Sequence, residues 1–433
     1  MKVQEPALIY NLFPLLAGPF TGWQPHLERA RSLGFNWIFI NPVSYPGFSG
    51  SLYAVKDYYK LNPLFVDKGS KLEPEEQLAR MLDQAHEIGL RVMIDLVINH
   101  TAIDSPLTSE HPAWYKRDRK GRIKNPGAWE GDRLVTVWGD LAEIDNENST
   151  ERDKLWNYWL KLIHYYLDLG FDGFRCDAAY KIPGELWNLL ISKARERSPQ
   201  TAFFAESLGC TIKEVVELAE AGFDYVFNSS KYWDFVEPWC LSQYEESRRL
   251  APSVSFPESH DTPRLMKELD FNLDAVRQRY AFAALFSTGV MIPSGFEFGF
   301  RKKLHVVRTR PSDWEETRLD LTDFISRVNR FKLSHPIFCA EHPTYRFDLH
   351  EGTGEVTGII KVMGKSGPCA LMLINRDPNH EQRVVIENIG GGLPGSSAMS
   401  LADPAAGFET ETVPEGSFER VLPPAGLWVI LRI

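Results

Sequence analysis

The sequence has few cysteines and no long apolar run. Its five cysteines, at positions 176, 210, 240, 339 and 369, show no paired spacing, which indicates reduced thiols rather than a disulfide framework. No apolar stretch is long enough to span a bilayer, and the first residues lack the charged-then-apolar order of a leader peptide. We therefore expect neither a disulfide-stabilised secreted protein nor a membrane protein, and a cytoplasmic location is favoured.

The sequence also lacks an excess of positive charge. Its 48 lysines and arginines are outnumbered by 58 aspartates and glutamates, which gives a net charge of -10. A chain of this charge is poorly suited to binding a phosphate backbone, so we expect no nucleic-acid partner. With 433 residues, the chain is long enough for one large domain and a smaller one. The oligomeric state is not indicated by the sequence.

One short stretch, residues 171–181, carries the first chemical signal. It reads as an apolar strand that ends on Arg175, Cys176 and Asp177. Because strand side chains alternate, Arg175 and Asp177 are expected on one face and Cys176 on the other. An arginine beside an aspartate keeps that carboxylate ionised and oriented, which suits a nucleophile. Taken alone, the pattern is more typical of an internal ion pair at a strand end.

Three further stretches have the same form, an apolar run that ends in polar groups. They are residues 91–100, 201–207 and 254–264. Catalytic groups at the ends of several buried strands are typical of the C-terminal rim of a parallel barrel. The four stretches together therefore favour a site over an isolated ion pair.

The order of expected elements predicts the architecture. Strands alternate with helices about eight times, which predicts an α/β fold, a (β/α)8 TIM barrel spanning residues 1–335. Residues 101–139 interrupt the alternation and are rich in Pro, Gly, Trp and charge, so we expect a short inserted loop region after strand 3. Short period-two strands over 340–433 predict a C-terminal antiparallel β-sandwich.

Four blocks resemble a known family when they are read in order. They are Asp95-Leu-Val-Ile-Asn-His100, Gly173-Phe-Arg-Cys-Asp-Ala178, Phe204-Ala-Glu206 and Ser259-His-Asp261. They resemble the four signature regions of the α-amylase family, glycoside hydrolase family thirteen. The resemblance implies Asp177 as nucleophile, Glu206 as general acid/base and Asp261 as a carboxylate that holds sugar hydroxyls.

Elementary chemistry agrees with this division of roles. Glycosidic cleavage needs one carboxylic acid to protonate the leaving oxygen and one carboxylate to trap the oxocarbenium-like sugar. Arg175 should keep Asp177 ionised, whereas Glu206 follows an apolar run where burial would raise its pKa. The resemblance also implies substrate-binding roles for a further set of residues: Tyr53, Asp57, His100, Arg175, Tyr180, Lys181 and His260.

Several positions depart from the family pattern. Tyr180 and Lys181 stand where starch-hydrolysing members commonly show a lysine-histidine pair, and Ser259 stands where asparagine is usual. The resemblance would place a calcium ion near Asn99, but Glu143 replaces the aspartate that often joins it. A hard cation wants six or more oxygen ligands, so calcium is left open with an incomplete ligand set, and no cofactor is certain.

The expected function is that of a retaining glycosidase or transglycosylase that cleaves α-1,4-glucosidic bonds of an α-glucan or maltooligosaccharide. Two alternatives stay open. Residues 110–114, 177–187 and the block ending at Glu206 are similar to the maltosyltransferase branch of the family, which uses maltose 1-phosphate, although that branch's extra N-terminal domains are lacking. The other alternative is a non-catalytic glycan-binding protein on an amylase scaffold.

Overall fold

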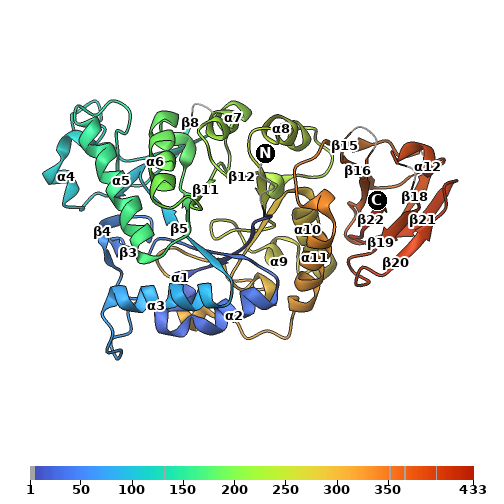
Figure 1. Ribbon diagram of the computed structural model, residues 1–433, viewed down its shortest axis with the longest axis horizontal. Helices are drawn as coiled ribbons and strands as arrows, with labels where there is room; N and C mark the ends of the chain where they lie inside the picture. The colour runs from blue at the N-terminus through green and yellow to red at the C-terminus, as the bar shows by residue number, and fades with distance from the viewer. Residues whose placement is uncertain (1–4, 131–132, 351–352, 365–366, 396) are drawn as a thin grey trace.

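The computed structural model describes residues 5–130, 133–350, 353–364, 367–395 and 397–433. Eight parallel strands close into a barrel, which confirms the predicted fold class (Figure 1). Their order around the barrel is β1 (Leu8–Leu12), β14 (Gly289–Pro293), β13 (Ser253–Ser255), β12 (Tyr225–Phe227), β11 (Ala202–Ala205), β10 (Gly173–Cys176), β5 (Arg91–Leu96) and β2 (Trp37–Ile40).

The barrel strands are buried on both faces, which is why their sequences are nearly continuous apolar runs. Helices cover the outside and bury the outward-facing side chains, Cys176 among them. The principal helices are α2 (Gln24–Ser32), α3 (Pro74–Glu87), α5 (Arg152–Leu169), α6 (Gly184–Arg197), α7 (Ile212–Glu220), α8 (Trp239–Ser247), α10 (Leu273–Phe286) and α11 (Thr322–Ser334). The barrel is therefore a packed scaffold whose chemistry lies at its rim.

The insertion after β5 has more regular structure than its composition predicts. Its short strands are β6 (His100–Ala102), β7 (Gly127–Glu130), β8 (Arg133–Val137) and β9 (Leu141–Glu143), and the pairing of β6 with β9 joins its two ends. Trp114 is buried and stacks on His111, with 3.9 Å between ring centroids. Trp138 is 39 % exposed. The insertion thus has a small core around Trp114 and exposes the aromatic side chain of Trp138.

The sequence predicts a helix over 230–250, and this prediction is too long. The structure has a 3-10 turn, η4 (Ser230–Tyr232), and then α8, which begins only at Trp239. Between them Phe235 adopts a left-handed φ of 65°, and the side chain of Asp234 accepts from the amides of Val236 and Glu237. Pro238 then precedes the helix, where its missing N–H costs nothing.

The C-terminal region is antiparallel, as predicted. A six-stranded sheet has the order β15 (Thr344–Phe347), β16 (Val356–Val362), β17 (Cys369–Asn375), β22 (Leu427–Arg432), β19 (Met399–Ala402) and β20 (Thr410–Val413). A two-stranded sheet, β18 (Gln382–Ile386) with β21 (Phe418–Leu422), shares an apolar core with it. This region lies beside α10 and α11 in Figure 1. The division of the chain near residues 335–340 stays a prediction.

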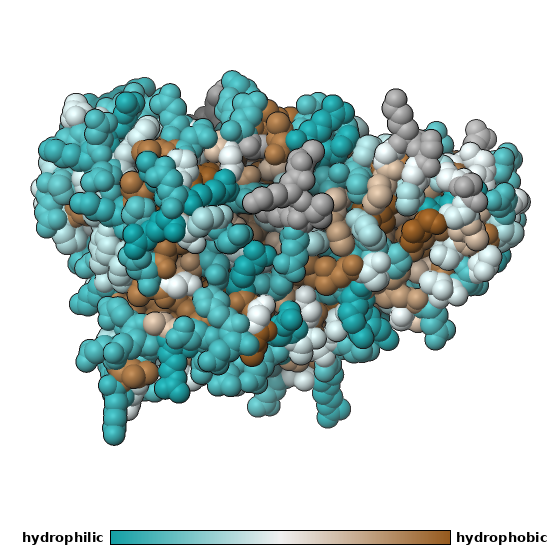
Figure 2. Space-filling model, in the orientation of Figure 1, coloured by the Kyte–Doolittle hydropathy of each residue, from teal (hydrophilic) through white to brown (hydrophobic). Residues whose placement is uncertain are grey.

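The surface shown in Figure 2 is mainly hydrophilic, with small scattered hydrophobic areas. Among the described residues, no helix combines the length and the apolar character needed to cross a membrane.

Candidate active site

Arg175, at the end of β10, is the centre of a charged cluster at the barrel rim. Its side chain is 7 % exposed, and its Nη1 donates to Asp177 Oδ1 at 2.8 Å. The same Nη1 lies 2.9 Å from both carboxylate oxygens of Asp95, and Nη2 lies 4.0 Å from Glu206 Oε2. The predicted pairing of Arg175 with Asp177 is confirmed. One guanidinium thus contacts or approaches three carboxylates from neighbouring strands β5, β10 and β11.

Asp95, the first residue of the signature block 95–100, is also a member of this cluster, although no site role is predicted for it from the sequence. It is directly opposite Arg175 in the pairing of β5 with β10, and its side chain is fully buried. Burial raises the pKa of Asp95 to about 7, against the opposing effect of Arg175. The sequence does contain a signal for Asp95: it is the one acidic residue in the stretch Arg-Val-Met-Ile-Asp-Leu, whose other residues after the arginine are apolar.

Glu206 follows β11 and is held by two backbone amides. Its Oε2 accepts from Ala178 N at 2.9 Å, and its Oε1 accepts from Leu208 N at 2.8 Å. Ala178, next to Asp177, has a left-handed φ of 41°, a strained conformation for a residue with a Cβ. Burial raises the pKa of Glu206, and the charge of Asp177 adds to this effect, while Arg175 opposes it.

A second group of site residues comes from the loop after β13 and from the loop before β4 (Val55–Leu61). Tyr53 Oη donates to Asp95 at 2.6 Å and lies 2.7 Å from His260 Nε2. The Tyr53 and His260 rings stack with 5° between their planes. His260 Nε2 is also 3.0 Å from Asp261 Oδ2, and the Asp261 side chain is 56 % exposed. These contacts join the predicted Tyr53, His260 and Asp261 to the cluster around Arg175.

Asp261 is held in its ionised form. Desolvation opposes ionisation, but contact with His260 and the positive charges of Arg175 and Lys303 lower the pKa of Asp261 to about 2. Its exposed carboxylate therefore accepts hydrogen bonds over the whole neutral range.

His100 and Asp57 are placed differently from the other predicted residues. His100, in β6, is buried, and its Nε2 lies 3.0 Å from the carbonyl oxygen of Tyr53, so it supports the loop that carries Tyr53. Asp57 is exposed on β4 and accepts from the amide of Tyr59. Among the described residues no contact joins Asp57 to the cluster. Substrate binding by His100 and Asp57 stays a prediction.

Tyr180 and Lys181 form the turn η3 (Ala179–Lys181) directly after the cluster and line a polar cavity. About 250 Å³ of this cavity is accessible to the centre of a water molecule, and α7 provides its opposite wall with Glu214 and Glu217. Burial and the charge of Glu206 raise the pKa of Tyr180. Lys181 Nζ lies 5.8 Å from the ring of Trp138. The cavity therefore lies on the Glu206 side of the cluster.

The residues near Asn99 do not fit a calcium ion. The two carboxylate oxygens of Glu143 each contact a lysine, Oε1 with Lys116 and Oε2 with Lys124, both at 2.9 Å. Asn99 Oδ1 is a buried oxygen without a partner among the described residues, but it lacks the acidic companions that a hard cation needs. Nor does the described part of the chain contain a cluster of three or more His, Cys, Asp or Glu side chains suited to a metal.

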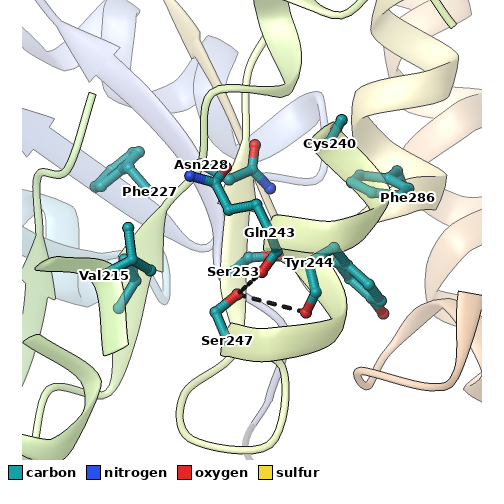
Figure 3. Close-up of a pocket in the computed structure, with 10 residues that line it drawn as sticks. Val215, Phe227, Asn228, Cys240, Gln243, Tyr244, Ser247, Ser253 and Phe286 are labelled. Carbon is teal, nitrogen blue, oxygen red and sulfur yellow. Dashed lines mark hydrogen bonds between the residues drawn. The ribbon is translucent and has the colours of Figure 1, made fainter. Parts of the chain in front are cut away.

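A different cavity lies behind the barrel wall, between β12, β13 and the helices α7, α8 and α10 (Figure 3). Its accessible space is about 10 Å³, which is room for about one water molecule. Figure 3 shows Ser247 bonded to the α8 backbone, at the carbonyls of Gln243 and Tyr244. This small void has no carboxylate in its lining and is a packing feature of the barrel wall.

The known proteins that this chain resembles in sequence include glucanotransferases, maltosyltransferases and α-amylases. The family model for the glycogen debranching enzyme, glucanotransferase domain, matches residues 7–118. The α-1,4-glucan:maltose-1-phosphate maltosyltransferase of Burkholderia pseudomallei is 26 % identical over 85 % of this chain and 32 % of its own length. Alpha-amylase 2 of Dictyoglomus thermophilum is 23 % identical over 75 % of this chain and 59 % of its own. The chain thus spans between one third and three fifths of these relatives.

Solved structures agree on the fold. An α-amylase from Lactobacillus plantarum superposes with a TM-score of 0.76 and 22 % identity, covering 99 % of both chains. With the sequence matches, this confirms the resemblance to the α-amylase family and the similarity to its maltosyltransferase branch.

Proposed function

We propose that this chain is a retaining α-glucan-active enzyme of the α-amylase family, which cleaves α-1,4-glucosidic bonds through a covalent intermediate on Asp177. The observation that carries the proposal is the position of one buried guanidinium, 2.8 Å from Asp177 and 4.0 Å from Glu206. Placing both carboxylates around one guanidinium suits the separation of about 5 Å that a retaining pair needs.

The proposed reaction has two steps. Asp177, oriented by its hydrogen bond from Arg175, attacks the anomeric carbon while Glu206 gives its proton to the leaving glycosidic oxygen. The sugar is then an ester on Asp177, and Glu206 is a carboxylate. In the second step Glu206 takes a proton from water or from an acceptor hydroxyl, and that oxygen displaces Asp177 from the sugar. Both groups return to their starting state.

The other site residues act on the sugar and its surroundings. Asp261, ionised and partly exposed, accepts hydrogen bonds from hydroxyls of the transferred unit, and Tyr53 offers its ring to the same sugar. The leaving group and the acceptor bind on the Glu206 side of the site, where Tyr180 and Lys181 line the cavity. This assignment follows from chemistry, because the proton donor must contact the oxygen that leaves.

Glycosyl transfer from maltose 1-phosphate is the second candidate, favoured by Lys181 at the cavity beside Glu206. The same cavity is lined by Glu147, Glu214 and Glu217, however, and three carboxylates oppose the binding of a phosphate. We therefore place hydrolysis or transglycosylation of a neutral leaving sugar first. A cytoplasmic location is part of the proposal, and the five free thiols suit a reducing compartment.

Product analysis by NMR tests the reaction class. The purified chain is incubated with maltoheptaose alone, and separately with maltose 1-phosphate and a glucan acceptor. We expect short products from maltoheptaose that first appear as α-anomers, because two displacements restore the configuration.

Other outcomes separate the alternatives. Phosphate release and chain extension only with maltose 1-phosphate would establish the transferase. First-formed β-anomers would contradict a covalent intermediate, and the absence of turnover with retained glucan binding would favour the non-catalytic protein.

A further inference from the structure

The loop between β14 and α11 carries an unusual density of positive charge. Residues 301–310 contain five arginines and lysines, one histidine and no acid, in a chain whose net charge is -10. The loop leaves the C-terminal end of a barrel strand, which places it at the same rim as the catalytic carboxylates.

Three of these five cations are engaged by the protein itself. Arg301 pairs with Glu315 at 3.2 Å, Lys302 pairs with Asp313, and Arg310 Nη1 donates to the carbonyls of Val307 and Thr309. Two remain, Lys303 and Arg308, which we call the rim cations. Both are exposed, and among the described residues neither has an ion-pair partner or a side-chain hydrogen bond.

The rim cations flank a segment that is fixed to the active site. The carbonyl oxygen of Val306 accepts from the amide of Leu52 at 3.0 Å, and Leu52 directly precedes Tyr53. Lys303 is near enough to Asp261 to favour its ionised form, and both rim cations act on the intervening His305. The pair therefore lies beside the Tyr53 and Asp261 part of the site.

The order of the barrel strands places the rim cations away from the leaving group. Glu206 follows β11, whereas the loop follows β14, three strands further around the ring. Glu206 must contact the departing oxygen, so the leaving sugar lies on its side. The rim cations therefore lie beside Tyr53 and Asp261, the residues that the proposed function assigns to the transferred sugar.

We propose that Lys303 and Arg308 form a subsite for an anionic group on the transferred sugar, with a phosphoryl group as the favoured ligand. The substrate class would be α-glucosides phosphorylated on the unit held by Tyr53 and Asp261. This inference rests on the proposed function. A neutral glucan leaves two cations beside the cleft without a counterpart, whereas an arginine fork and a lysine provide the donors that phosphate oxygens accept.

The test compares three chromogenic substrates on the full chain: 4-nitrophenyl α-glucoside, its 6-phosphate and the matching α-glucuronide. We expect kcat/KM for the phosphate to exceed that for the neutral glucoside by about 10- to 100-fold, the scale of one or two charge-assisted hydrogen bonds. This ratio should fall toward one in the double variant Lys303→Ala/Arg308→Ala, and it should fall with rising salt in the parent chain.

A matched control removes two lysines from the segment before α3, Lys68→Ala/Lys71→Ala, and so changes the net charge equally. Its ratio should equal that of the parent. Calorimetric titration of glucose 6-phosphate, glucose and glucuronate into Glu206→Gln gives the same comparison without turnover. Tighter binding of glucuronate than of glucose 6-phosphate would support an anion subsite but would overturn the phosphoryl group as its ligand.

The failures of the two proposals are distinguishable. A ratio near one in the parent chain, with maltoheptaose still cleaved, would overturn the anion subsite and leave the proposed function intact. Loss of the preference in the control as well as in the double variant would also overturn it. If no substrate, maltoheptaose included, were turned over, the proposed function itself would be wrong.

Discussion

Glu206→Gln is expected to lower turnover of maltoheptaose by about 10²- to 10⁴-fold, the usual contribution of a positioned general acid/base. The amide keeps the shape of the side chain and accepts hydrogen bonds only through its single oxygen, and its N–H protons are not acidic enough to be transferred to the leaving oxygen. A glycosyl fluoride should be affected less in the first step, because fluoride leaves without protonation. The measurement is kcat for both substrates in parent and variant.

The pH profile provides a second measure of the same residue. Burial raises the pKa of Glu206, and activity needs its protonated form, so the parent should lose activity as pH rises through that pKa. The variant should lack this alkaline limb. Glu185→Gln, at an exposed position in the first turn of α6, is the control and should retain both turnover and profile. Unchanged turnover in Glu206→Gln would show that another group supplies the proton.

Lys332→Met is expected to destabilise the protein by about 2–4 kcal/mol, because it leaves buried carbonyl groups without a donor. Lys332, in α11, is fully buried, and its Nζ donates to Ala284 O at 2.8 Å, Ser287 O at 2.7 Å and Phe338 O at 2.6 Å. Two of these carbonyls lie at the end of α10, where backbone acceptors have no partner within the helix. The side chain thus joins three segments at the base of the C-terminal region.

Urea unfolding followed by tryptophan fluorescence measures this effect. The control is Arg330→Met on the same helix, at an exposed position, which should change the free energy of unfolding by less than about 0.5 kcal/mol. Equal midpoints for the two variants would contradict the role given to Lys332.

Stability should also depend on pH through this residue. Burial lowers the pKa of Lys332 to about 7, and that of the neighbouring Lys361 to about 8, from the ordinary 10.5. Between pH 7 and about 10, both lysines are protonated in the unfolded chain but lose their protons in the folded protein. The unfolded chain therefore binds more protons, and the free energy of unfolding should rise as pH increases over this range. In Lys332→Met the rise should be smaller, since only Lys361 contributes.

The barrel could be predicted because its evidence is local. Each strand is a short apolar run, and each end carries its polar groups in sequence, so Arg175, Asp177 and Glu206 could be placed together at the rim before the structure, while their catalytic roles stay predictions. The alternation of side chains also gave the correct faces for Arg175 and Cys176. These placements depend on the alternation of side chains along a strand, which is a local property that tertiary contacts do not change.

The rest depends on contacts between distant segments. The role of Asp95 as the buried partner of Arg175 follows from the register of β5 with β10. Lys332 looks like any surface lysine in sequence, and only the packing of α11 on α10 shows that it is buried. β4 presents Asp57 to solvent, and its expected contact with the substrate stays a prediction. The prediction of one helix over 230–250 is wrong because the left-handed conformation of Phe235 interrupts it.

The central claim, a covalent intermediate on Asp177, is tested most directly by trapping it. Glu206→Gln is incubated with α-maltosyl fluoride, which needs no acid for the first step and lacks the base for the second. After proteolysis, mass spectrometry should find one maltosyl unit on the peptide that contains Asp177. A label on Asp261 or Asp95 instead, or fluoride release without any labelled peptide and with an inverted product, would contradict the mechanism.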